Sequence, residues 1–475
     1  MTRTRLFALS LIVAALAGCM TVGPDYKRPQ IETPGQLPGA TANEPLISTW
    51  WKAYGDPVLN QMIDEALVYN LDLRRAIARV NEARAALGIT RADQYPGVSA
   101  NTSASRNRGS QDSSLSVPGI DSAYRATLNA SYEIDFWGKY RRATEAARAE
   151  LLGSQFNREA VRLALIADVA RGYFGLRALD AQVAITRRTI STRQASTALQ
   201  RMRFEAGVAS EFELRQVEAE AAQAQALLPT IEQQLAVQET ALGVLLGRSP
   251  RAIVEQPVER GAAMDALNVP PSIPSGLPSE MLERRPDLRQ AEQSLVAANA
   301  RIGQAKAAYY PSISLTGFIG GESSTLSGLF DASARVWQFA GSAAQTVFDA
   351  SRTRSRVGVA EARQQQALAQ YQSAIQNAFK DALDALVSQR KAREMMEAER
   401  MRIDALHISM RLAQLRYDNG ISSLLDVLIA ERALLEAQLN RVEAQRAQLA
   451  ATADLFKALG GGWDGLPDSD KSAKN

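Results

Sequence analysis

Strict alternation of apolar and polar side chains marks the segment from Tyr124 to Phe136. A period of two is typical of a β-strand with one apolar face and one face in contact with water. The apolar positions are Tyr124, Ala126, Leu128, Ala130, Tyr132, Ile134 and Phe136. Their span is longer than the roughly 9–11 residues with which a tilted strand crosses a bilayer. We therefore predict a membrane-spanning strand.

This strand has a predicted partner of smaller residues, from Val98 to Ser105, which completes a β-hairpin at about residues 97–137. The residues between the two strands, Arg108 to Ser122, are rich in Gly, Ser and Asp and indicate a long polar loop. A second hairpin is predicted at about residues 312–348, with strands from Ser312 to Gly320 and from Val336 to Phe348.

Long segments of helical composition surround both hairpins. Their apolar residues recur mostly at steps of three and four, which is the spacing of one helix face. The predicted helices cover about residues 58–91, 141–206, 211–246 and 352–417, with a kink expected at Pro229. Helices of this length must pack against others along their length, because isolated helices are only marginally stable in water.

The chain repeats itself. Asp72-Leu73-Arg74 returns as Asp287-Leu288-Arg289, and Tyr95-Pro96 returns as Tyr310-Pro311. We predict two structural repeats, 58–247 and 279–462, each with the order helix, strand, strand, long helix, turn, helix. The turns fall at 203–210 and 416–423. The remaining parts are a signal peptide at 1–18, an extended segment at 19–57, a proline-rich linker at 248–278 and a loose tail at 463–475.

Charge and composition exclude several classes of function. The chain has 54 basic and 51 acidic residues, whereas a nucleic-acid partner requires a clear basic surplus. It contains one Cys and one His, so a His/Cys metal site or a Ser-His-Asp triad would depend on His407 alone. We expect no cofactor and no metal, and an enzyme is the least supported class. His407 lies in the middle of a predicted helix and is expected to be packed or on the surface.

The N-terminus predicts export and lipidation. Two arginines precede an apolar run from Leu6 to Ala17, which is too short for a stable membrane span. The run ends in Leu16-Ala17-Gly18-Cys19, which resembles the bacterial lipobox and implies cleavage before Cys19 and acylation of its thiol. Two or three acyl chains would anchor the protein stably. An uncleaved anchor, or a standard signal peptide with an incidental Cys, is the alternative.

Four strands cannot close a barrel by themselves. A sheet within lipid cannot leave its edges unpaired, so closure must come from several chains in a cyclic oligomer. Two chains would supply eight strands and three would supply twelve. The many Gln, Glu and Arg residues of the helices fit a wall in contact with water, and hence a water-filled tube. A small soluble sheet is the alternative.

Several motifs resemble the outer membrane factor family of TolC-like ducts, and most closely its lipoprotein branch of OprM and NodT type. These motifs are Trp50-Trp51, Leu282 to Leu288, Ala307 to Thr316, Phe348-Asp349 and Ala458 to Trp463. The resemblance implies a mainly α protein with membrane β-structure. In such a protein three chains form a twelve-stranded barrel in the outer membrane, continued by a periplasmic helical barrel. It also implies a periplasmic adaptor (membrane fusion protein) and an inner-membrane RND-type pump as partners.

The resemblance also suggests functional residues. The two helical turns, with Arg203, Gly207, Arg416 and Gly420, would contact the adaptor, although the glycines would suit any tight turn. Leu425 and Asp426 match the rings that close the periplasmic end of the tunnel, although Asp426 would equally suit an exposed surface. Ile429 stands where the family usually has a second Asp. Glu213 takes the place of Asp426 in the first repeat, and whether it lines the pore is left open.

The expected function is that of a passive exit duct in a tripartite efflux pump. A near alternative within the family is the exit duct of a type I protein secretion system. Outside the family, a periplasmic adaptor or a structural coiled-coil lipoprotein would share the anchor and the helices. Neither would require two long amphipathic β-hairpins placed symmetrically in a repeat.

Overall fold

The computed structural model describes residues 21–32, 34, 48–109, 119–270, 284–463 and 465. The chain divides into two compact units. The first unit comprises Met1–Gln30, Arg79–Gln155 and Gln290–Gln372, and the second comprises Ile31–Ala78, Phe156–Arg289 and Ser373–Asn475. Each unit thus takes segments from both predicted repeats. Among the described residues, no helix is long and apolar enough to cross a bilayer.

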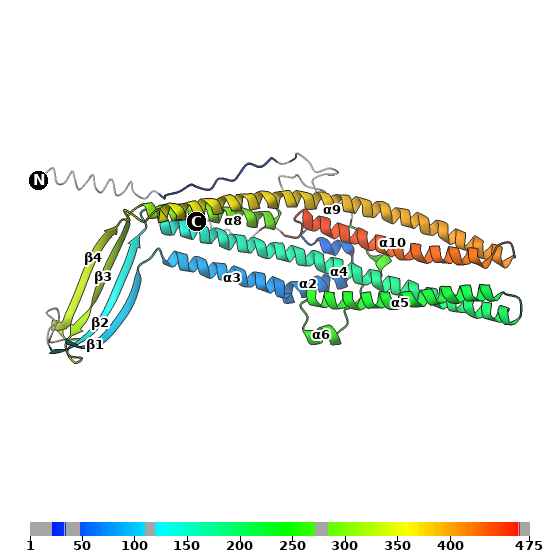
Figure 1. The fold of residues 1–475 in the computed structure, drawn as a ribbon, viewed down its shortest axis with the longest axis horizontal. Coiled ribbons are helices and arrows are strands. Elements are labelled where there is room, and N and C mark those ends of the chain that lie inside the picture. Colours follow the sequence, from blue (N-terminus) through cyan, green and yellow to red (C-terminus); the bar gives the residue numbers. More distant parts are fainter. Residues whose placement is uncertain are drawn as a thin grey trace. The chain divides into compact units, whose positions relative to one another are not determined.

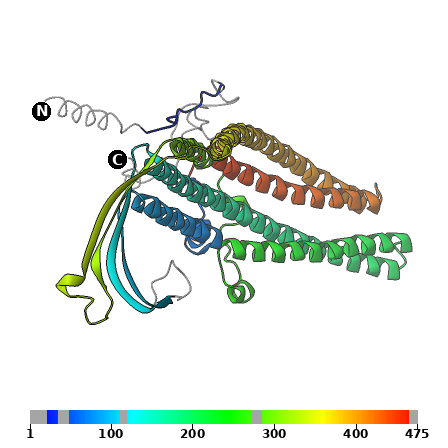
Figure 2. The same ribbon diagram turned by 60° about the vertical axis from the view of Figure 1, so that its left-hand side comes forward.

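The first unit contains a four-stranded antiparallel sheet, and Figures 1 and 2 show its strands side by side and curved together. The strands are β1 (Gly97–Gly109), β2 (Gly119–Ile134), β3 (Ser312–Ser323) and β4 (Arg335–Ala344), in the order β1-β2-β3-β4. Both predicted hairpins are confirmed. Their bounds were partly wrong, because the β1–β2 pairing continues to Gly109 and Gly119, well into the expected loop, and β4 ends before Phe348.

The register of the sheet aligns its apolar residues across all four strands. Leu128 on β2 is opposite Ala100 and Ile319, and Ile319 is opposite Trp337. Leu128, Ile319 and Trp337 are 54, 63 and 77% exposed in the single chain. A continuous exposed apolar face of this kind marks a surface that contacts a membrane or another protein.

The opposite face of the sheet contains the alternating polar residues. Arg125 lies 4.7 Å above the centre of the Phe318 ring and 3.7 Å from the carboxylate of its cross-strand neighbour Glu322. Thr127, two residues further along β2, is buried. The period-two pattern of the sequence therefore separates the two faces as predicted.

Helices complete the first unit. They are parts of α3 (Leu71–Ala92), α4 (Lys139–Glu205), α8 (Pro286–Lys306) and α9 (Arg352–Asp418). Val80 and Leu87 of α3 pack against Ala147 and Leu151 of α4. On another face, α4 meets α8 through small residues: Ala146, Ala149, Ala297 and Ala300. Alanines at both sides of such a contact allow the two backbones to approach closely.

The second unit is helical, with its core where several helices meet. It contains η1 (Trp50–Tyr54), α2 (Pro57–Tyr69), α5 (Glu211–Leu245) and α10 (Leu424–Ala458), together with parts of α3, α4, α8 and α9. Trp50, Tyr54, Tyr173 and Phe174 are fully buried in this core. The Trp50 ring stacks on Phe456 at 5.0 Å between centroids. In both views α5 runs beside α4, and α10 runs beside α9.

The prediction of one helix from about 58 to 91 was wrong. Asn70 separates α2 from α3, because its side-chain oxygen accepts hydrogen bonds from the backbone amides of Asp72 and Leu73 at 2.9 and 3.0 Å. Its amide nitrogen donates to the carbonyl oxygen of Leu245, at the end of α5. Because an N-cap residue has a non-helical backbone conformation, Asn70 ends α2 as it begins α3. Hydrophobic periodicity does not reveal a break of this kind. Farther along, α5 continues through Pro229 without interruption.

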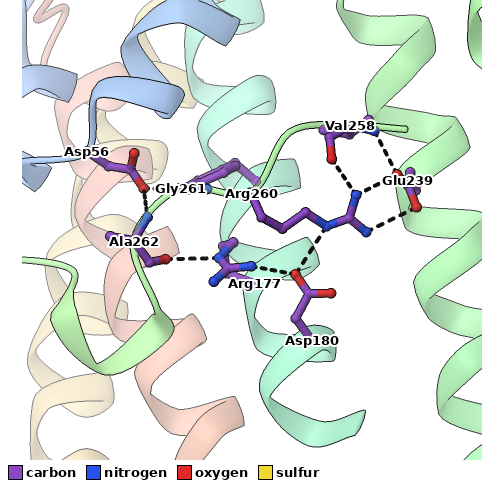
Figure 3. A network of polar contacts seen from close by, with 9 residues as sticks. Asp56, Arg177, Asp180, Glu239, Val258, Arg260, Gly261 and Ala262 are labelled. Atoms are coloured by element: carbon purple, nitrogen blue, oxygen red, sulfur yellow. Dashed lines mark hydrogen bonds and ion pairs between the residues drawn. The ribbon is translucent and has the colours of Figure 1, made fainter. Parts of the chain in front are cut away.

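The predicted linker is described over residues 248–270, where it contains α6 (Pro250–Glu255) and η2 (Met264–Ala266). Figure 3 shows how polar contacts hold it on the helices. Asp56, at the start of α2, accepts a hydrogen bond from the amide of Ala262 at 3.0 Å. Arg260 pairs with Glu239 of α5 and Asp180 of α4, and the hydrogen bond from Arg260 holds the pKa of the Glu239 carboxyl below its usual value.

Trp463 was predicted to begin the loose tail, but its ring meets Phe156 edge to face and its indole nitrogen donates to the carbonyl oxygen of Arg284. The predicted signal peptide and the predicted lipidation site Cys19 lie outside the described residues, as does the tail after Trp463 apart from Gly465.

Candidate functional site

The two helical turns of the second unit have the same backbone geometry. At the end of α4, the amide of Val208 donates to the carbonyl of Arg203 at 2.9 Å. At the end of α9, the amide of Ile421 donates to the carbonyl of Arg416 at 2.8 Å. The glycine before each donor, Gly207 or Gly420, has a φ of 72° or 70°. This is the hydrogen-bond pattern of a Schellman helix end, in which glycine avoids a steric penalty.

Lack of space for a side chain does not explain why glycine occupies these two positions. A Cβ atom added at Gly207 or Gly420 would meet no atom within 4 Å. The requirement for glycine therefore comes from the positive φ alone. The prediction of two equivalent tight turns is confirmed, whereas contact with an adaptor remains a prediction.

The helices that follow the turns begin differently. Before α5, Ser210 and Glu213 form a capping box, in which the Glu213 carboxylate accepts from the Ser210 amide at 2.9 Å. Before α10, Ser423 makes no side-chain capping bond. Asp426, which matches Glu213 in the repeat, is exposed, and its carboxylate has no hydrogen bond to any described residue. Glu213 is thus used within its own turn, while Asp426 is available to other partners.

The first turns of α10 present two distinct faces. Leu424, Val427 and Leu428 are buried and pack against Leu214 and Val217 of α5. Leu425, Asp426 and Ile429 are exposed on the other face. The structure thus brings the predicted gate residues together on a surface that is open in a single chain. This placement is compatible with a pore lining.

Arg203 joins the two turns through a residue that the sequence did not single out. Its guanidinium donates to the hydroxyl of Tyr417 on α9 at 3.1 Å and lies 5.9 Å from the centre of that ring. Tyr417 is the repeat counterpart of Phe204, and the comparison of the two turns could have drawn attention to its additional hydroxyl. Arg416, the counterpart of Arg203, is exposed.

A second connection between the two helical hairpins is ionic. Glu220 of α5 pairs with Arg193 of α4 at 3.2 Å and also with Arg432 of α10. Glu220 is 7% and Arg193 4% exposed, whereas the side chain of Arg432 is 57% exposed. Nearby, burial raises the pKa of the Glu431 carboxyl. Sequence analysis did not identify this cluster, because it joins residues more than 200 positions apart.

Known proteins resemble both halves of the chain. The family model for "Outer membrane efflux protein" matches residues 62–248 and 277–461. The probable efflux pump outer membrane protein TtgC of Pseudomonas putida is 36% identical over 467 residues, which cover 96% of this chain and 95% of the relative. The probable outer membrane lipoprotein SilC of Salmonella typhimurium is 33% identical over 98% of this chain and 100% of the relative.

A solved structure has the same fold along nearly the whole chain. The Campylobacter jejuni CmeC outer membrane channel superposes with a TM-score of 0.90 at 26% identity, covering 96% of this chain and 98% of that chain. The resemblance seen in the sequence motifs is confirmed, and the chain belongs to the outer membrane efflux protein family.

Proposed function

We propose that three copies of this chain join their sheets into a twelve-stranded barrel in the outer membrane. The observation that supports this most directly is the four-stranded sheet, in which β1 and β4 each have one edge without a partner in the described part of the chain. Unpaired backbone groups are too costly to leave in lipid. Because the four strands alternate in direction, β4 of one copy would meet β1 of the next in antiparallel pairing.

The helices would form the periplasmic part of the duct, and small molecules such as drugs would pass through it to the exterior. This chain would supply the passive exit of a tripartite pump of the RND type, and an inner-membrane partner would supply the energy. On this proposal the duct makes and breaks no covalent bond. The likeness along the full length to an efflux pump outer membrane protein favours efflux over protein secretion.

The two turns would contact the periplasmic adaptor. Arg203 and Arg416 would offer charge, while Gly207 and Gly420 would fix the shape of each turn. Exposed Val208 and Ile421 follow the glycines and add apolar surface at the same place. A pair of similar turns on each of three chains would offer six similar contacts to a ring of adaptors.

Leu425 and Asp426 would form constricting rings at the periplasmic end. A ring of three leucines can close a pore by excluding water, and a ring of three carboxylates favours cations. The exposed position of both side chains in the single chain supports this assignment. The proposed acylation of Cys19 is supported by the sequence alone.

The test is the assembly state and conductance of the full-length protein purified in detergent. We expect light scattering to give a protein mass of three chains, and electron microscopy to show three-fold particles with a detergent belt. Inserted in planar bilayers, these particles should produce discrete conductance steps. A monomer, or a trimer without a detergent belt, would refute closure of the sheets into a membrane barrel.

A further inference from the structure

The first unit contains a cavity of about 800 Å³ in which every charged lining residue is basic. It lies between α8, the first turns of α9 and the beginning of α4. Its charged lining residues are Lys139, Arg301, Arg352, Arg356 and Arg363, and no Asp or Glu lines it. Apolar and small polar residues of α8 and α9, among them Ala298, Gln304 and Val359, complete the wall. The proposed duct function assigns no role to this cavity.

Helix geometry directs three of these cations into the same space. Arg356 and Arg363 follow Arg352 by four and eleven residues, and at 3.6 residues per turn both spacings return to the same helix face. Arg354, in the same turn, lies on another face and does not line the cavity. The arginines of α9 thus form a stripe along one wall.

The three arginines of α9 are the lining cations that form no ion pair in the described part of the chain, although Arg352 interacts electrostatically with the nearby Asp349 carboxylate. Lys139 pairs with Glu133 at 3.0 Å, and Arg301 pairs with Glu150. In the described part of the chain, no carboxylate lies within 4.0 Å of the guanidinium groups of Arg352, Arg356 or Arg363. Three like charges on one wall repel each other, so an anion that enters the cavity would be attracted.

The cavity lies beside the end of the sheet from which the helices continue. α4 begins five residues after β2 ends at Ile134, and α9 begins eight residues after β4 ends at Ala344. At the same end, Trp137 stacks on Tyr310 at 4.6 Å between centroids and donates to the carbonyl of Pro311 at 2.8 Å. Trp and Tyr are enriched at the level of lipid headgroups.

Exposed apolar residues lie close in sequence to the cationic stripe. Val347 and Phe348, in the segment between β4 and α9, are almost fully exposed. Phosphate oxygens accept the paired N–H donors of arginine well, and acyl chains need apolar contacts nearby. Basic pockets at a membrane surface bind anionic lipid headgroups for these reasons.

We propose that this cavity binds the phosphate group of an anionic glycerophospholipid from the periplasmic leaflet, through Arg352, Arg356 and Arg363. The lipid source depends on the proposed barrel, which places the cavity at headgroup level. Three bound lipids would then surround each trimer at its entry into the membrane. The arginines donate hydrogen bonds to the phosphate oxygens, while Val347 and Phe348 contact the acyl chains.

The experiment measures lipid binding to the delipidated, full-length trimer by native mass spectrometry. The probes are phosphatidylglycerol, phosphatidylcholine and inorganic phosphate. The variant Arg352→Gln/Arg356→Gln/Arg363→Gln removes the stripe. The control Arg354→Gln/Arg393→Gln/Arg411→Gln removes three exposed charges from the same helix, none of which lines the cavity.

We expect the wild type and the control to bind phosphatidylglycerol saturably, with phosphatidylcholine much weaker. Each arginine removed should weaken binding about fivefold, the equivalent of about 1 kcal/mol, so the triple variant loses on the order of 100-fold. Equal binding by the triple variant and the control would overturn the site. Phosphate binding that depends on the three arginines, without selective lipid binding, would overturn the lipid as its source. Oligomeric mass and conductance, measured on the same samples, test the duct separately.

Discussion

Replacement of Arg432 by Gln should make the duct open more readily. The side chain of Arg432 on α10 pairs with Glu220 on α5, so the pair joins the hairpin α4–α5 to the hairpin α9–α10. Opening of the periplasmic end by movement of one hairpin against the other would break this pair. Glu220 keeps Arg193 as a partner at 3.2 Å, so the variant leaves no buried charge without compensation.

The expected change in the opening equilibrium depends on how exposed the Arg432 side chain is to water. Because the side chain of Arg432 is 57% exposed, the pair is screened by water and contributes about 0.5–1 kcal/mol rather than the 3–5 kcal/mol of a broken buried pair. If three copies open together, the contributions of the three pairs add to about 1.5–3 kcal/mol. Loss of all three pairs would raise the ratio of open to closed ducts by roughly 10- to 150-fold. Replacement of Glu220 would instead leave Arg193 buried and unpaired, and would confound gating with instability.

The assay is the open probability of single ducts in planar bilayers, with the entry of a large antibiotic into cells as a second measurement. Arg402→Gln is the matched control, because Arg402 pairs with Glu436 at 3.2 Å within the hairpin α9–α10 and does not join the two hairpins. An open probability of Arg432→Gln that equals those of the wild type and the control would refute the reasoning.

Three further predictions concern single positions. Replacement of Gly207 or Gly420 by Ala should lower the free energy of unfolding by about 1–2 kcal/mol, because a Cβ is disfavoured at positive φ. Replacement of the helical Gly358 by Ala should instead raise it by up to about 1 kcal/mol. A change of stability in the same direction at all three positions, measured by thermal unfolding, would contradict this. Cys19→Ala should abolish incorporation of labelled palmitate while trimers still form, and label in the variant would exclude the lipobox. Asp426→Ala should increase conductance or antibiotic leakage, and unchanged values would remove this carboxylate from the gate.

Local patterns in the sequence were sufficient for most elements of the fold. Alternation located the strands, spacings of three and four located the long helices, and the repeated glycines located both turns. Each of these signals arises from backbone geometry within a few residues, so no knowledge of distant contacts is needed. The break at Asn70 shows the limit, since a cap depends on one side chain and a neighbouring helix end rather than on a period.

Only the tertiary structure decided which candidate residues are available for function. Glu213 and Asp426 occupy equivalent places in the sequence repeat, yet the Glu213 carboxylate is hydrogen-bonded within its own turn, whereas the Asp426 carboxylate has no hydrogen bond to any described residue. The connection from Arg203 to Tyr417 and the cavity lined by residues of α4, α8 and α9 likewise bring together segments far apart in the chain. Periodicity specifies that a residue lies on a helix face, but the partner of that face depends on how the whole chain packs.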